Sequence, residues 1–293
     1  VFTRDSNGRL IEAIDTLGRK ITYVYNNEER LVEVKDFINR SIKFQYDSNG
    51  DLVSVTSPSV TGTPNSNDFP DGKTTKYTYS SGFQDEKLNH SLLTVIAPNE
   101  VAKGGTPSTI NVYETNPNSY AYGRVIKQTY GGTNASGIKA GGDIIYQYKE
   151  LTQNPLTTND PVNRVTVTDR NTNKTIYEHN RLGNAVSIKE YTRGIREGEP
   201  EFYKTSFEYN ADGERTKSIL PEGNKVNNTY ASEPPGSVDY MKSRFKHGNF
   251  LRNKQIPDSD RGGNQQQVDP TYTYEPIYNL VRMQTDPRGN DPD

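Results

Sequence analysis

The sequence predicts an all-β protein built as an array of antiparallel β-hairpins, and three observations lead to this prediction. Apolar residues recur at every second position in short runs, as Ile42, Phe44 and Tyr46 do, which is the period of a half-buried strand. Turn sequences such as Asp-Ser-Asn-Gly separate these runs, and Asp, Asn and Gly are residues that tight turns favour. The combined pattern of strand and turn recurs along the chain, so the hairpin is expected to be a repeated unit.

The composition fits a β protein with an aromatic core. Hydrophobic residues make up 30% of the 293 residues, below the roughly 45–50% of ordinary globular chains, and this alone would favour disorder. However, the chain has 20 Tyr and 9 Phe, which bury large areas and favour strands. An aromatic-rich sheet with many polar loops accounts for both facts.

The repeat has a period of about 21 residues, visible in the spacing of Tyr25 from Tyr46 and of Leu10, Leu31 and Leu52. Two turns alternate within it. The first turn reads DSNG at 5–8, NNEE at 26–29, DSNG at 47–50, NRLG at 180–183 and NADG at 210–213. The second reads DTLG at 15–18, DFIN at 36–39, LPEG at 220–223 and DPRG at 286–289. Apart from Glu29 in the first turn, the last position is Gly or Asn, which adopt the left-handed conformation most readily.

The strand that precedes the first turn ends in two aromatic residues, two positions apart. Such a pair lies on one face of a strand, so stacked hairpins would carry an aromatic ladder on that face. The pairs are Tyr23/Tyr25, Phe44/Tyr46, Tyr77/Tyr79, Tyr146/Tyr148, Phe207/Tyr209 and Tyr272/Tyr274, with Tyr177/His179 as a variant. A fixed repeat of 20–50 residues is typical of arrays in which each unit packs against its neighbours.

The array is expected to occupy residues 1–293 as one segment of a longer protein. The chain opens inside a turn-like motif and stops at DPRGNDPD, so both ends are expected to continue. Stretches rich in Gly, Pro, Asn and Ser are interpreted as loops inserted at hairpin ends, because the repeat resumes after each. These loops are 57–72, 97–109, 131–142, 152–161, 231–238 and 257–270.

Three stretches resemble the RHS or YD repeat, in which Tyr-Asp, two variable residues and Gly precede an Arg-Leu pair. They are YDSNGDLVSV, YNADGERTKSI and YNNEERLVEV. Arg9-Leu10 and Arg30-Leu31 match the Arg-Leu pair, whereas Asp51-Leu52 and Glu214-Arg215 depart from it. The clear matches lie toward the two ends of the chain, and the middle, 80–178, diverges.

The resemblance implies a fold and a function. RHS repeats occur in bacterial polymorphic toxins, in the B and C components of insecticidal toxin complexes, in bacterial surface proteins and in teneurins. In that family they form a long, twisted, spiralling sheet that is part of a hollow shell, often around a C-terminal toxin. The chain is therefore expected to be a structural, non-enzymatic shell segment of a large secreted or cell-surface protein. Its expected partners are flanking repeats and a C-terminal domain of the same polypeptide, and no cofactor is expected.

Two other functions stay open from the sequence. The first is a cell-surface adhesin or glycan-binding array, in which exposed tyrosines would stack on sugars. The second is a hydrolase with its site in the inserted loops. If the tyrosines instead form the sheet's core, then Tyr25, Tyr46, Tyr79, Tyr148, Tyr209 and Tyr274 should lie on one face, each packed against its equivalent in the neighbouring repeat.

Several function classes are disfavoured. The net charge is −2 and no basic run is present, so the electrostatic signature of a nucleic-acid binder is missing. No apolar stretch approaches the ~20 residues of a membrane span. Cysteine is absent, which removes disulfides and thiolate metal sites.

Catalytic and metal sites are not predicted. The chain has three histidines, His90, His179 and His247, and no Gly-x-Ser-x-Gly motif accompanies them. The Asp-rich turns at Asp5 and Asp47 lack the further ligands and the Glu at position twelve of a calcium loop. They are interpreted as turns.

The C-terminal tail offers two weak alternatives. Asp286, Asp291 and Asp293 could bind a cation weakly, and DPRG at 286–289 resembles a string found near a self-cleavage module in RHS proteins. Because 286–289 also matches the second turn of the repeat, a turn is the preferred interpretation.

Overall fold

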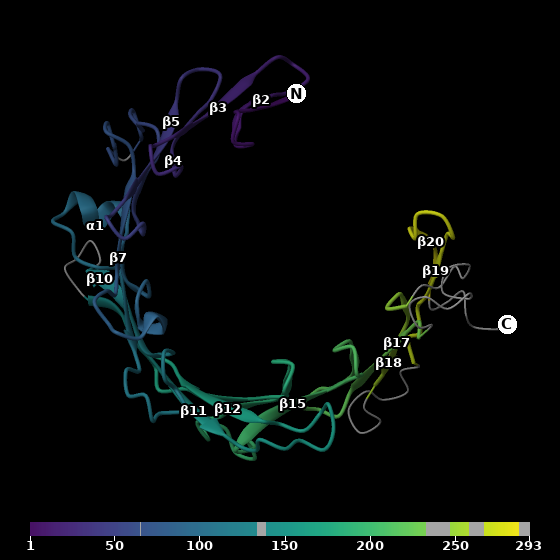
Figure 1. Cartoon of the computed structure of the whole chain (residues 1–293). Coiled ribbons are helices and arrows are strands. Elements are labelled where there is room, and N and C mark those ends of the chain that lie inside the picture. The colour runs from purple at the N-terminus through teal and green to yellow at the C-terminus, as the bar shows by residue number, and fades with distance from the viewer. Residues whose placement is uncertain (65, 134–138, 233–246, 258–266, 287–293) are drawn as a thin grey trace. The chain divides into compact units, whose positions relative to one another are not determined.

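The computed structural model describes the chain apart from residues 65, 134–138, 233–246, 258–266 and 287–293 (Figure 1). The described residues form twenty strands, all assigned to one sheet. The strands are β1 (Phe2–Arg4), β2 (Leu10–Ile14), β3 (Lys20–Tyr25), β4 (Leu31–Lys35), β5 (Ser41–Tyr46), β6 (Leu52–Thr56), β7 (Thr74–Tyr79), β8 (Leu92–Ile96), β9 (Thr109–Tyr113), β10 (Val125–Thr133), β11 (Lys139–Glu150), β12 (Asn163–Thr168), β13 (Lys174–His179), β14 (Ala185–Tyr191), β15 (Phe202–Tyr209), β16 (Arg215–Ile219), β17 (Lys225–Tyr230), β18 (Phe250–Ile256), β19 (Thr271–Tyr274) and β20 (Val281–Thr285).

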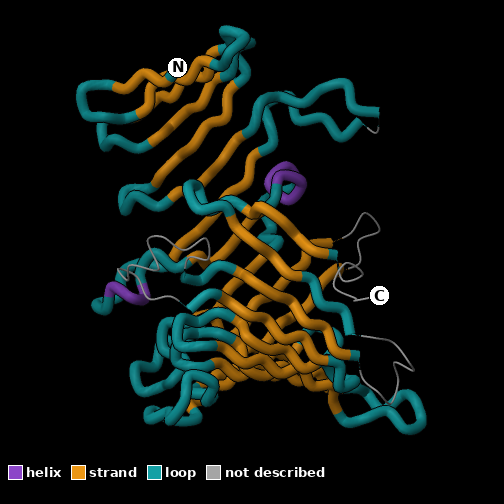
Figure 2. The backbone as a smooth tube through the Cα atoms, turned by 90° about the vertical axis from the view of Figure 1, so that its right-hand side faces the viewer, coloured by secondary structure: helices purple, strands orange, loops and turns teal. Residues whose placement is uncertain are grey.

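The all-β prediction is confirmed. The helices of the described residues are one 5-residue α-helix, α1 (Pro98–Ala102), and one 3-residue 3₁₀ helix (Glu86–Leu88). The described strand pairs are antiparallel and join strands that follow one another in the sequence, as the hairpin repeat predicts. The chain divides into two compact units, Val1–Ile144 and Ile145–Asp293, and within each unit the strands lie side by side (Figure 2).

In the first unit, the two faces of the sheet differ in chemistry. Cross-strand partners share a face, and the register pairs Tyr23 with Val34, Val34 with Ile42, and Phe44 with Val55. Because alternate residues of a strand also share a face, the aromatic pairs of β3, β5 and β7 all lie on this side, which we call the aromatic face.

The opposite face of the first unit is polar. It carries ion pairs between Lys20 and Glu12 (2.5 Å) and between Lys35 and Glu33 (3.1 Å). Further along, cross-strand threonine hydroxyls bond to each other, Thr56 to Thr74 at 2.9 Å and Thr78 to Thr94 at 2.7 Å. Such pairs are the sheet's usual lateral contacts.

The second unit repeats this division. The register places Tyr148, Val165, Tyr177 and Ile188 in one row on its aromatic face. Its polar face carries ion pairs between Arg164 and Glu178 (2.6 Å) and between Lys217 and Glu208 (2.8 Å). Few side chains in either unit are fully buried; the buried apolar residues of the described chain are Leu88, Ala121, Ile176, Val186 and Ala231. The sheet is therefore stabilised mainly by contacts between neighbouring strands.

Two of the expected loops contain regular structure. The stretch 97–109 holds α1, and 131–142 includes the end of β10 and the start of β11. Gly141 has φ +122°, and a Cβ there would collide with the Tyr130 carbonyl. The glycines at the two ends of this stretch thus allow two strand backbones to approach closely. The middle of the predicted loop, 134–138, lies outside the described residues, as do most of the predicted loops 231–238 and 257–270.

The two kinds of turn share one geometry. In the first turn, Asp5 Oδ1 accepts hydrogen bonds from the backbone N–H of Asn7 and of Arg9, both at 2.9 Å. In the second turn, Asp15 Oδ1 accepts from Leu17 (2.8 Å) and Arg19 (3.0 Å). In both turns, a guanidinium Nε then bonds to the other carboxylate oxygen at 2.7 Å. The fourth residue is left-handed, with φ +82° at Gly8 and +77° at Gly18, which explains the preference for Gly or Asn.

Candidate functional site

The feature that recurs most regularly in the molecule is a β-bulge after each first turn. In the β3–β4 pair, Tyr25 lies opposite Leu31 while Val24 lies opposite Glu33, so Val32 is an extra residue. The same shift occurs in nine described pairs, each joining an odd-numbered strand to the next strand. The pairs joined through second turns show no such shift. We call the side of the sheet with first turns the bulged edge, and the other side the regular edge.

A tyrosine hydroxyl from the following repeat bonds to the carbonyl at the bulge. Tyr25 donates to the Leu10 carbonyl and Tyr46 donates to the Leu31 carbonyl, both at 3.0 Å. A bulge disrupts the ladder locally, and a buried carbonyl without a partner costs about 1–3 kcal/mol. The hydroxyl therefore satisfies a group that the bulge removes from the ladder.

This bond occurs six times in the described chain. Besides Tyr25 and Tyr46, the donor and acceptor pairs are Tyr113 to Leu92 (3.1 Å), Tyr209 to Ala185 (2.9 Å), Tyr230 to Arg215 (3.2 Å) and Tyr274 to Phe250 (2.9 Å). Each bond spans from one hairpin to the one before it. The tyrosines thus connect successive repeats.

The surroundings of five of these tyrosines favour the bonded arrangement, through burial at three of them and through stacked arginines at two others. Burial raises the pKa of Tyr113, Tyr209 and Tyr230 above the ordinary value, so the hydroxyl proton that makes the bond is retained. In the first unit, the guanidinium of Arg9 lies 5.1 Å from the centre of the Tyr25 ring, and that of Arg30 lies 5.7 Å from the Tyr46 ring. These are cation–π distances.

The predicted aromatic ladder needs one correction. Ring contacts in the described chain include Tyr191–Phe202, Tyr230–Phe250 and Phe250–Tyr272. However, none of the described ring contacts joins two members of the set Tyr25, Tyr46, Tyr79, Tyr209 and Tyr274. The repeat spacing separates these rings by two strands, about 10 Å, and the hydroxyl bond bridges the intervening strand instead.

The aromatic-pair pattern also missed two of the six bonded tyrosines, Tyr113 and Tyr230, and misjudged a third tyrosine. Tyr113 makes the bond although it lacks an aromatic residue two positions earlier; Asn111 stands there and donates to the same Leu92 carbonyl at 2.8 Å. A lone Tyr at a strand end before a polar turn is the signal that could have identified it. Conversely, the hydroxyl of Tyr79 has no hydrogen-bond partner among the described residues.

The turn aspartates are engaged in the turns themselves. Both oxygens of Asp5 are occupied by backbone N–H groups and Arg9, and Asp47 Oδ1 accepts from Asn49 and Asp51 at 2.9 Å. Among the described residues, no group of three or more His, Asp or Glu could hold a metal ion. Asp286 belongs to the described chain, whereas Asp291 and Asp293 and most of the 286–289 string lie outside it.

The three histidines bond to Asp or Asn. His90 Nδ1 lies 2.9 Å from Asp51, and His247 Nε2 lies 3.1 Å from Asp212. His179 lies 3.1 Å from Asn163, and burial lowers its pKa. No serine–histidine pair is formed in the described chain. The geometry supports structural roles for the histidines: His90 and His247 each link one first turn to the next connection on the bulged edge.

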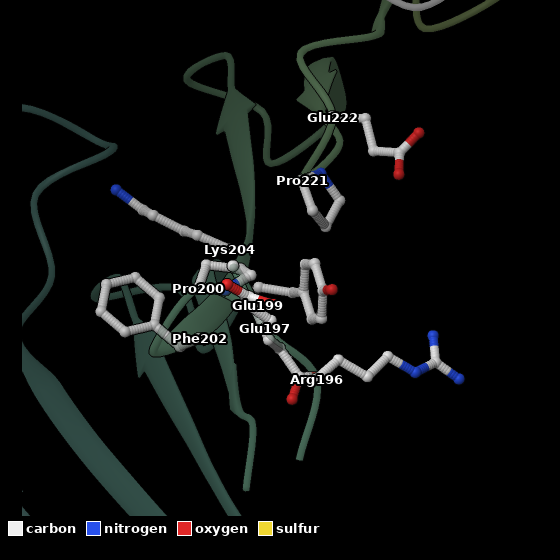
Figure 3. A pocket seen from close by; sticks show the side chains of 10 residues that line it. Arg196, Glu197, Glu199, Pro200, Phe202, Lys204, Pro221 and Glu222 are labelled. Carbon is white, nitrogen blue, oxygen red and sulfur yellow. The ribbon is translucent and has the colours of Figure 1, made fainter. Parts of the chain in front are cut away.

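A cavity of about 540 Å³ lies between loop 192–201 and the turn at 220–223. Its charged lining residues are Arg196, Glu197, Glu199, Lys204 and Glu222. Figure 3 shows Arg196 and Lys204 pointing in opposite directions, with Glu222 directed away from both. Because the charged groups do not converge on one point, the cavity lacks the arrangement typical of a ligand site.

Comparison with known families identifies the repeat in one part of the chain. Residues 4–37 match the family model described as RHS Repeat. No curated protein matches the chain. Among solved structures, the chain is similar to a crystal structure of TcdB2-TccC3 (13% identity, TM-score 0.29) and to the Tc holotoxin pore of Photorhabdus luminescens (12% identity, TM-score 0.29). In both cases 96% of this chain and 18% of the other are covered.

A third solved structure is a porin-like protein from Bacteroides uniformis, at 11% identity and a TM-score of 0.24. There, 89% of this chain and 57% of the other chain are covered.

The chain spans less than a fifth of the length of the Tc structures it matches. No helix among the described residues has the length and apolar composition needed to cross a bilayer.

Proposed function

Because the chain carries an RHS repeat and is built from repeated hairpins, we propose that it is a non-enzymatic wall segment. This wall encloses a passenger domain of the same polypeptide. The wall would belong to a secreted or cell-surface protein. The observation that supports this proposal is the repeated hydrogen bond from a tyrosine hydroxyl to the carbonyl at a bulge. In this bond the hydroxyl holds the protein's own backbone and is not presented to a ligand.

The two faces support a wall with different surroundings on each side. The polar face carries ion pairs and hydroxyl pairs suited to water, while the aromatic face is only half-buried and no second layer of described strands covers it. An apolar, uncovered face of a monomeric protein commonly contacts another chain segment. A passenger domain of the same polypeptide would supply that segment.

A glycan-binding role for the repeated tyrosines is less favoured. A tyrosine that binds sugar must present its ring and hydroxyl to the ligand, but six hydroxyls here bond to backbone carbonyls. The same bonds explain why tyrosine, rather than phenylalanine, stands at these positions.

Limited proteolysis of the full-length polypeptide tests the proposal. The domain that follows the repeats should resist protease in the intact polypeptide and become cleavable once the repeats unfold in urea. The control is the same domain expressed without the repeats. Equal cleavage rates for the free domain and for the domain in the native full-length polypeptide would contradict enclosure.

A further inference from the structure

The regular edge of the first unit exposes a cluster of large apolar side chains. Leu17 is 75% exposed, Phe37 53% and Ile38 56%, and all three occupy tips of second turns. We call the cluster the apolar edge; it consists of Leu17, Ile21, Phe37, Ile38 and Ile42.

The turn itself does not require apolar residues at these tips. The turn at 36–40 is held by Asp36, which accepts from the backbone N–H of Ile38 (3.0 Å) and of Arg40 (2.9 Å). The turn at 47–51 has the same bonds with Ser48 and Asn49 at its tip. Apolar tips therefore expose hydrophobic area that the hydrogen bonds of the turn do not require, and within the described chain only the Phe37 ring has a stacking partner, Arg19. Such exposed area is typical of a contact surface.

A groove lies beside these tips on the aromatic face. Its volume is about 410 Å³, and Phe2, Ala13, Ile21 and Phe37 supply its apolar lining. The hollow arises at Ala13, because the equivalent positions one and two repeats later hold Val34 and Val55. The groove can accept a large apolar side chain.

The charges around the groove are balanced. Asp15 pairs with Arg19 and Asp36 pairs with Arg40, both at 2.7 Å. The Nη groups of these two arginines have no hydrogen-bond partner in the described chain. A neutral rim gives no attraction to an anionic bilayer or to an acidic protein, but it is complementary to another rim with the same alternation of Asp and Arg.

We propose that the apolar edge binds the apolar edge of a second copy of this chain. In a two-fold contact, the same patch serves both partners, so Phe37 of each copy enters the other copy's groove. The two apolar turns are two strand spacings apart, about 10 Å, which lets the tips of one copy fit between those of the other. The few apolar residues of this patch are fewer than the roughly 20–30 residues per partner of a standard interface, so we expect weak association, with a Kd of about 10–100 µM.

The test is sedimentation velocity of the 293-residue chain over a concentration series. The variant Phe37→Ser with Ile38→Asn gives the second turn the Ser-Asn tip of the turn at 47–51, so the hydrogen bonds of the turn are kept. Wild type should form dimers, and the double variant should weaken dimerisation at least about tenfold. The control, Asn171→Ser, alters a polar second-turn tip in the second unit and should leave dimerisation unchanged.

Three results would overturn the proposal. One is a wild-type chain that stays monomeric at about 100 µM. Another is dimerisation that the double variant does not weaken. The third is a monomeric chain that instead cosediments with phosphatidylserine-containing vesicles through Phe37 and Ile38, which would assign the apolar edge to a membrane surface.

Discussion

The two edges of the sheet between residues 1 and 56 are built from the same turn, yet they connect the repeats differently. At the bulged edge, successive turns contact each other: Asn7 bonds to Glu29 at 3.1 Å, and Arg9 lies 3.4 Å from the same carboxylate. Tyrosine bonds across the bulges reinforce these contacts. At the regular edge, the contact between turns is Arg19 stacked 5.6 Å from the Phe37 ring centre.

This difference shows that the turn sequence alone does not decide how a repeat is joined to its neighbour. Asp5 and Asp15 make equivalent hydrogen bonds within their turns. In the next two repeats, however, a tyrosine (Tyr25 and Tyr46) stands directly before the first turn, whereas no tyrosine stands before the second turns at 15–18 and 36–39. The residue before the turn, together with the bulge after it, sets the edge that holds the repeats in order. The regular edge is left available for other contacts.

The largest effect is expected from removing a whole tyrosine at the bulged edge. Tyr46→Ala deletes a half-buried ring and leaves the Leu31 carbonyl without its donor. Because Tyr46 is only half-buried, we expect a loss of about 2–3 kcal/mol in the free energy of unfolding, less than the ~3–5 kcal/mol of a fully buried aromatic. Ile42→Ala, on the same strand toward the regular edge, should cost about 1 kcal/mol. Urea unfolding of both variants measures the difference, and equal losses would remove the distinction between the edges.

A glycine pair provides a second comparison of the edges. Gly50, in a first turn, has φ +91°, and a Cβ there would collide with the Arg30 guanidinium; Gly18, in a second turn, has φ +77° and open space. Gly18→Ala should cost about 1 kcal/mol from the left-handed backbone alone. Gly50→Ala should cost about 0.5 kcal/mol more, because the Arg30 guanidinium must move away from the Tyr46 ring on which it stacks. Thermal and urea unfolding of both variants test this. An equal cost at the two sites would show that Arg30 does not pack tightly against this turn.

A smaller, pH-dependent effect should be shared by both edges. Bonds from the backbone N–H and then the guanidinium of Arg19 lower the pKa of Asp15. Burial opposes the shift at Asp5, but the bonds from Arg9 outweigh it and its pKa is also lowered. A carboxyl whose folded pKa is depressed adds stability above its unfolded pKa of about 3.9, and that stability is lost as the pH falls through the folded pKa.

Asp15→Asn and Asp5→Asn should therefore each flatten the fall in stability below about pH 4. Urea unfolding measured between about pH 2 and pH 7 tests both variants against wild type. An unchanged pH profile in either variant would mean that the corresponding Asp–Arg pair does not contribute.

How much of this could be predicted depends on the range of each interaction. Strands, turns and the shared face of the tyrosines follow from local rules, namely period-two alternation and the left-handed fourth residue of the turn. The bulge could not be predicted, because one extra residue such as Val32 leaves the alternation of apolar and polar residues almost intact. The same extra residue changes which backbone carbonyl is unpaired. The tyrosine bond depends on that carbonyl and was missed for the same reason.

Composition alone does not distinguish a glycine in a loop from a glycine that serves a close approach of two strands. The glycines of 131–142 indicated a loop, yet Gly131 and Gly141 lie in paired-strand backbone near Tyr130. By contrast, DFIN at 36–39 is predicted as a second turn, and the structure places the exposed residues Phe37 and Ile38 in a turn between β4 and β5.

The most direct test of the central claim, that tyrosine hydroxyls join successive repeats, compares two tyrosines on one strand. Tyr25 donates to the Leu10 carbonyl at 3.0 Å, whereas the hydroxyl of Tyr23, on the same face, has no partner among the described residues. The measurement is the free energy of unfolding in urea for Tyr25→Phe and Tyr23→Phe. We expect a loss of about 1 kcal/mol for Tyr25→Phe and a change within about 0.5 kcal/mol for Tyr23→Phe. Equal effects of the two substitutions would contradict the claim.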